Sequence, residues 1–125
     1  MPHRVSSRFS ITSASISAEW LSYKISWPIT ERHDANETMP QNVSVFDLGI
    51  GDYHKVDQHL AAVKRALLGE EKVLSELAGE CTYALWIDYR FPKNGGSINL
   101  PTSLQSFFTF MNVELVFHLR TFAES

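Results

Sequence analysis

The stretch Cys81-Thr-Tyr-Ala-Leu-Trp-Ile-Asp-Tyr-Arg90 decides the class of the fold. Its five odd-numbered residues are apolar or aromatic, and they alternate with a second set that includes Trp86, Asp88 and Arg90. A period of two predicts a β-strand with one buried face. On that strand, Trp86, Asp88 and Arg90 lie on the face away from the core.

A tight reversal is expected directly after this strand. The run Pro92-Lys-Asn-Gly-Gly96 ends in residues that tolerate positive φ, as such a turn requires. A short strand over Ser97–Leu100 is therefore expected to follow.

The length and composition indicate one ordinary globular domain over residues 1–125. The chain is 44% hydrophobic and 20% charged, with a formal net charge of -3. Lys64 and Arg65 are the only adjacent basic pair, so no clustered basic face suggests a nucleic-acid partner. The single cysteine, Cys81, excludes an internal disulfide and suits the cytoplasm. Neither a signal peptide nor a membrane-spanning segment is predicted.

The first part of the chain predicts a strand over Val5–Thr12 and then a helix. Ser15 or Ser17 caps this helix, which ends at about Ile25 before Pro28. Disorder or a transit peptide is the alternative interpretation of the serine-rich start.

A polar loop and a second strand are expected next. The loop spans Pro28–Asn42, about fifteen residues, a length typical of functional or disordered loops. The strand spans Val43–Leu48 and is ended by Gly49 and Gly51.

The strongest helical pattern covers Tyr53–Leu68, with Asp52 as its cap. Its apolar stripe consists of Val56, Leu60, Val63 and Leu67. Further elements are predicted as a helix over Glu70–Ala78, a helix from Pro101 or Thr102 to Met111, a left-handed exit at Asn112 and a strand over Val113–Thr121.

These elements predict the order β-α-β-α-α-β-β-α-β. The fold class is α+β, a two-layer sandwich with a mostly antiparallel open sheet and helices on one face. A ferredoxin-like arrangement is the first expectation.

No residue pattern predicts catalysis, a metal or a cofactor. His54 and His59 are five apart, on different helix faces, and a solvated role is preferred for them over a metal site. Cys81 opens a core strand, where a free cysteine is usually an apolar filler. Asp47 and Asp88 are interpreted as solvated aspartates rather than an acid–base pair.

Gly49-Ile-Gly51 before a helix is similar to a phosphate-binding turn. The third glycine of that fingerprint is replaced by His54, and the lysine of a P-loop is absent. A strand-to-helix turn explains the two glycines without a ligand.

Several segments together match the pattern of one known family. They are Phe9-Ser-Ile-Thr-Ser13, Ile16-Ser-Ala-Glu-Trp20, Ile25-x-x-Pro28, Val56-x-x-x-Leu60, Leu67-Leu68, Leu85-Trp-Ile87, Asn94-Gly-Gly-x-Ile-x-Leu100 and Phe110 to Leu119. In these segments the chain resembles a family of short bacterial proteins catalogued as domain of unknown function 4279. The resemblance departs at Val45-Phe46, where that family usually has a tryptophan, and it implies no activity and no catalytic residues. Small acidic proteins of this kind sometimes serve as immunity partners of secreted toxins.

Three functions remain open. The first is a non-enzymatic protein-binding module, of immunity type in one version, that uses an exposed Trp86 face together with acids of the 28–42 loop. The second is a small-molecule binder or enzyme with a polar cleft between sheet and helices. The third is a structural homodimer joined through the sheet face. In the protein-binding module, the residues expected to contact the partner are Trp86, Asp88, Arg90, Glu31, Asp34 and Glu37. In the small-molecule binder or enzyme, the residues expected around the cleft are Tyr83, Tyr89 and His118.

Overall fold

The computed structural model describes residues 4–51, 53, 55–92 and 97–121. Within them the chain forms one five-stranded sheet and four helices, and none of these helices is long and apolar enough to cross a membrane. The elements are β1 (Arg4–Ser13), α1 (Ala18–Lys24), β2 (Ile29–His33), β3 (Asn42–Phe46), α2 (Val56–Leu68), α3 (Glu71–Leu77), β4 (Thr82–Phe91), α4 (Thr102–Phe110) and β5 (Val113–Thr121).

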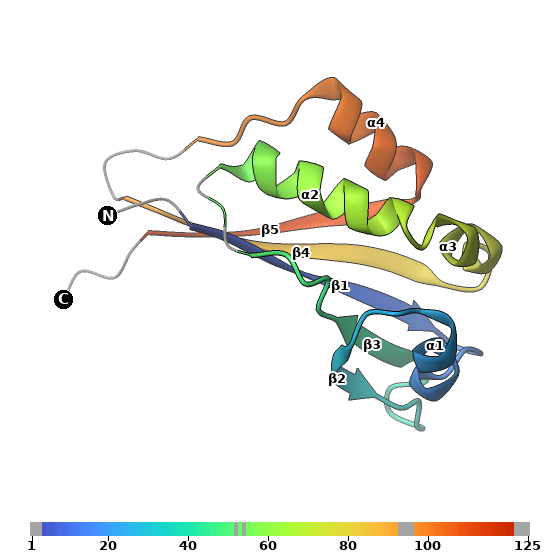
Figure 1. Cartoon of the computed structure of the whole chain (residues 1–125). Helices are drawn as coiled ribbons and strands as arrows, with labels where there is room; N and C mark the ends of the chain where they lie inside the picture. Colours follow the sequence, from blue (N-terminus) through green and yellow to red (C-terminus); the bar gives the residue numbers. More distant parts are fainter. Residues whose placement is uncertain (1–3, 52, 54, 93–96, 122–125) are drawn as a thin grey trace.

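The sheet is mixed, with the strand order β2-β3-β1-β4-β5. Strand β1 lies at its centre and pairs antiparallel with β3 and β4, while β4 and β5 are parallel. The helices cover one face of the sheet (Figure 1). The α+β class is therefore confirmed.

The ferredoxin-like order is not confirmed. In a split β-α-β arrangement a third strand separates the two strands that flank a helix. Here β4 and β5, which flank α4, are directly adjacent. The observed element order is β-α-β-β-α-α-β-α-β.

Part of the expected 28–42 loop is a strand, which corrects the prediction. Strand β2 pairs antiparallel with β3, with a register irregularity between Ile29 and Glu31. The hydroxyl of Thr30 donates a hydrogen bond to the carbonyl of Val45 at 3.2 Å. A short, charged edge strand has little of the apolar alternation by which strands are detected, because its outer side faces water.

The expected strand over Ser97–Leu100 is absent, since residues 97–100 lie outside the strands. The chain instead passes from β4 through α4 to β5. Because β5 is parallel to β4, the two strands need such a crossover connection and cannot be joined by a tight turn. The predicted Asn94-Gly95-Gly96 turn lies outside the described residues. Asp52, the predicted cap of α2, also lies outside the described residues. Helix α2 begins at Val56, three residues later than expected, and Lys55 occupies its N-cap position.

The core lies between the sheet and the helices. The predicted α2 stripe is confirmed, because Val56, Leu60, Val63 and Leu67 are all buried. The odd-numbered side chains of β1 and β4 point into the same layer. The most deeply buried of these include Phe9, Ile11, Tyr83, Leu85 and Ile87.

Two predicted helix ends are confirmed. The hydroxyl of Ser17 accepts a hydrogen bond from the backbone N–H of Trp20 at 3.2 Å, as an N-cap does. Asn112 has a φ of 58°, in the left-handed region, where asparagine is tolerated. This residue turns the chain from α4 directly into β5.

Replacement of the α1 cap tests which serine holds this helix. Ser17→Ala is expected to lower the free energy of unfolding by about 1 kcal/mol, because a first-turn amide loses its acceptor. Ser15→Ala, two residues away and exposed, is the matched control and should change it much less. Chemical denaturation followed by circular dichroism measures both; equal losses would contradict the assignment.

The buried phenol of Tyr83 predicts a loss of stability in alkali. Burial raises the pKa of Tyr83 above its ordinary value of 10.0, and its hydroxyl donates to the carbonyl of Leu74 at 2.6 Å. Above pH 10 the unfolded chain loses this proton before the folded chain does, so the free energy of unfolding should fall as pH rises. Tyr83→Phe should show a shallower fall in denaturation curves between pH 9 and pH 11; an unchanged slope would refute this origin.

Candidate functional site

Among the residues that the structure describes, no helix lies on the sheet face formed by the even-numbered residues of β1, β4 and β5. We call it the helix-free face. Its residues lie in rows across the three strands, because the pairing register places them opposite one another. The rows are Arg8, Trp86 and Val116; Ser6, Asp88 and His118; and Arg4, Arg90 and Arg120.

Trp86 is the main apolar feature of this face, and 52% of it is exposed. Its indole N–H donates to the hydroxyl of Ser10 at 2.9 Å. Ser10 is itself buried and donates to the carbonyl of Ala84 at 3.4 Å. The exposed indole is therefore held in one orientation by a group of the neighbouring strand.

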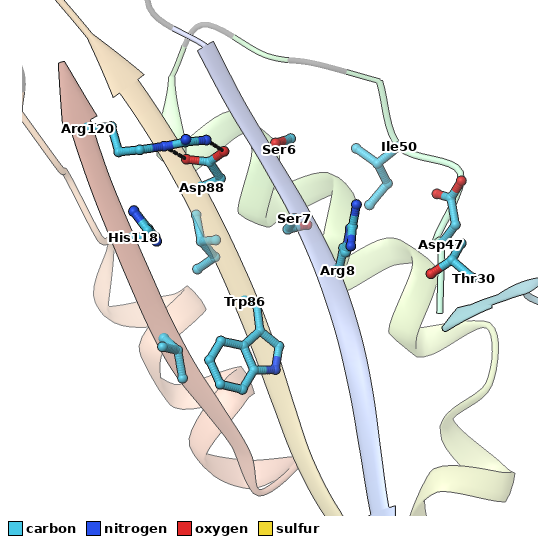
Figure 2. Close-up of a pocket in the computed structure, with 12 residues that line it drawn as sticks. Ser6, Ser7, Arg8, Thr30, Asp47, Ile50, Trp86, Asp88, His118 and Arg120 are labelled. Atoms are coloured by element: carbon cyan, nitrogen blue, oxygen red, sulfur yellow. Dashed lines mark hydrogen bonds and ion pairs between the residues drawn. The ribbon is translucent and has the colours of Figure 1, made fainter. Parts of the chain in front are cut away.

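Asp88 and Arg90, predicted beside Trp86, lie on the same face, and Asp88 is bound to arginines. Arg120 of β5 donates to Asp88 through two nitrogens, one of them Nε at 3.1 Å (Figure 2). The hydrogen bond to Asp88 raises the pKa of Arg120 above its ordinary value. Arg90 Nε lies 3.8 Å from the same carboxylate. Asp88 thus joins β4 to β5 at this end of the face.

A hollow of about 580 Å³ lies on the helix-free face. Figure 2 shows Trp86, His118 and Arg120 on one side of β1, and Asp47 and Ile50 on the other. The β3–α2 connection forms that second wall. The other residues that line the hollow are Ser6, Ser7, Arg8, Thr30, Ile87, Asp88 and Val116.

The three predicted acids of the 28–42 segment do not form one cluster with Trp86. Glu31 reaches the helix-free face, because its carboxylate lies 2.8 Å from the guanidinium of Arg8. Asp34 pairs with Arg32, also at 2.8 Å, and lies beyond the end of β2. Glu37 is exposed in the connection between β2 and β3.

Asp47 and Asp88 do not form a carboxylate pair. Strand β1 separates β3 from β4, so the two aspartates stand at opposite sides of the hollow. Asp47 accepts a hydrogen bond from the N–H of Gly49 at 2.9 Å, and Gly49 has a φ of 74°. This local turn accounts for the glycine there without a phosphate.

His59 is buried and does not face water, which corrects the solvated interpretation. Its Nε2 lies 2.7 Å from the hydroxyl of Ser7, on the helix side of the sheet. The pair joins α2 to β1 at a distance typical of a nucleophile and its base. Ser7 also lines the hollow, but the buried His59 does not, so the pair belongs to the packing of α2 against the sheet. His54 lies outside the described residues.

Cys81 is buried, and its environment opposes nucleophilic reactivity. Burial raises the pKa of the Cys81 thiol, the hydrogen bond with Ser13 acts in the opposite direction, and Glu80 adds to the rise. A reactive cysteine has a lowered pKa and solvent access. Among the residues that the structure describes, no group of three or more histidine, cysteine or acidic side chains is arranged to hold a metal ion.

The cleft expected between sheet and helices is not formed by the residues proposed for it. Tyr83 and Tyr89 are buried in the packed core, whereas His118 lies on the helix-free face. Sequence reasoning also missed Ser10, Arg8 and Val116 as neighbours of Trp86, and Arg120 as the partner of Asp88. Their alternation along β1 and β5 was visible, but the register that aligns these strands with β4 was not.

Comparisons with protein-family models, with curated proteins and with solved structures found no match to this chain.

Proposed function

We propose that this chain is a non-enzymatic protein-binding module that recognises its partner through the helix-free face. The observation that carries the proposal is the exposed, oriented indole of Trp86. Tryptophan and arginine are the residues most enriched among binding hot spots. An aromatic side chain already fixed by Ser10 loses little conformational entropy when a partner covers it.

The surroundings of Trp86 also favour a protein partner. Val116 lies beside it and adds to an apolar centre. Arg8 in the same row and Asp88 and His118 in the next row border this centre with polar groups, as in protein interfaces. An immunity-type role against a bacterial toxin is one version of this proposal, and the resemblance to the family of unknown function is compatible with it. In that version Glu37 is the acid with most access to a basic partner, because Glu31 and Asp34 are ion-paired.

A small molecule in the hollow is the second candidate. Its volume falls within the range of roughly 300–1,000 Å³ that ligand sites occupy. Trp86, Arg8 and His118 offer stacking and polar contacts there. A structural homodimer joined through this face is the third, and would cover Trp86.

Truncation of the tryptophan tests the proposal. The partner is captured from lysate of the native host with immobilised protein, identified by mass spectrometry, and titrated as a purified protein by calorimetry. Trp86→Ala is expected to weaken binding by about 30-fold or more, the factor that corresponds to a hot-spot loss of about 2 kcal/mol. Tyr23→Ala is the matched control, since Tyr23 is an 81% exposed aromatic residue on α1.

Equal affinity of the Trp86→Ala and wild-type proteins would remove the helix-free face from the account. The second candidate would be favoured by a different result: a small molecule binds saturably, no captured protein competes with it, and Trp86→Ala abolishes its binding.

Charge reversal tests the acidic segment in the same complex. Glu37→Lys is expected to slow association with a basic partner at low salt, and the effect should shrink as salt screens the charges. Glu76→Lys, the same change on the exposed side of α3, is the control. Stopped-flow association rates measure both; equal rates would exclude Glu37 from the interface.

A further inference from the structure

The outer edge of β5 is a second surface with the features of an interface. β5 is nine residues long and follows β4 without a register shift from Val113 to Thr121. It contains neither proline nor lysine, which commonly protect the edges of natural sheets. The opposite edge, β2, is five residues long, charged and irregular in register. β5 is therefore the edge better suited to pairing.

Exposed apolar side chains lie beside this edge. Leu119 of β5 is 52% exposed, although it belongs to the helix side of the sheet. Phe110, at the end of α4, is 76% exposed, and α4 lies over β5 in Figure 1. These two residues stand at opposite ends of β5, because Asn112 turns the chain back beneath the helix.

The sequence of β5 is complementary to itself in the antiparallel direction. With Phe117 opposite Phe117 of a second copy, Glu114 stands opposite Arg120, Leu115 opposite Leu119, and Val116 opposite His118. Two opposite-charge pairs and two leucine pairs result, because a two-fold interface repeats each contact.

Neighbouring registers lack this match. Moving the centre by one residue leaves either Arg120 or Glu114 opposite a residue outside β5. Arg120 is already bound to Asp88, but a guanidinium has five donors and can serve two carboxylates.

We propose that two copies of this chain pair along β5, antiparallel and centred on Phe117, so that their sheets join edge to edge. Phe110 of each copy then lies at the end of β5 that faces Leu119 of the other. Because the two-fold axis is perpendicular to the sheet, both Trp86 side chains stand on one continuous helix-free face. The inference is independent of the proposed function, since the pairing leaves that face uncovered.

Sedimentation velocity of the full chain over a range of concentrations tests the pairing. The wild-type protein is expected to be a dimer that dissociates on dilution. Leu119→Lys should sediment as a monomer with an unchanged circular dichroism spectrum, because it places a charge opposite Leu115 of the second copy. Leu68→Lys is the matched control, a 44% exposed leucine of α2, and should remain dimeric.

Two further variants distinguish the alternatives. Glu114→Lys, on the exposed side of β5, turns both attractive pairs into repulsive ones and should raise the dimer dissociation constant at least tenfold at low salt. Trp86→Ala should leave the dimer intact. A wild-type monomer at every concentration, or a dimer that resists both β5 substitutions, would overturn the proposal. A dimer lost through Trp86→Ala would place the contact on the helix-free face.

Discussion

The register of β1 against its two neighbours is the constraint on which the rest of the structure depends. Phe9 stands opposite Phe46 on one side and opposite Leu85 on the other, so all three lie in the layer beneath the helices. A slip of one residue would move every side chain of β1 to the other face. The burial of these aromatic and aliphatic groups therefore fixes the register, and with it both faces of the sheet.

The candidate site is a consequence of the same register. Since odd-numbered residues of β1 and β4 enter the core, the even-numbered ones must share the opposite face. Arg8 and Trp86 thereby become neighbours, although 78 positions of sequence separate them. Ser10 holds the indole of Trp86 through a hydrogen bond, and the pair of Asp88 and Arg120 joins the strands at the far end of the face. The side chains of this surface are therefore already positioned before a partner binds.

Much of the fold could be predicted from local patterns. The alternation around Trp86, the stripe of α2, the Ser17 cap and the Asn112 exit all depend on residues close in sequence. The strand order could not, because the pairing of β1 with both β3 and β4 is a long-range choice that no local pattern encodes. Strand β2 was missed since an edge strand exposed on most sides needs few apolar residues.

The site was predicted in part for the same reason. The exposure of Trp86 follows from its own strand, whereas its neighbours on β1 and β5 follow from the register. The burial of His59 was missed because a helix that packs on a sheet can turn a polar residue inward where Ser7 offers a hydrogen bond.

Solvent accessibility of individual side chains in the free protein is the most direct test of this account. A soluble paramagnetic gadolinium chelate broadens NMR signals of groups that water reaches. The ring C–H groups of Trp86, which is half exposed, should broaden strongly, while the methyl groups of Leu85 and Leu60, which are buried, should not. Protection of Trp86 equal to that of Leu85 would show that the sheet face is covered in solution, and would contradict its role as an open recognition surface.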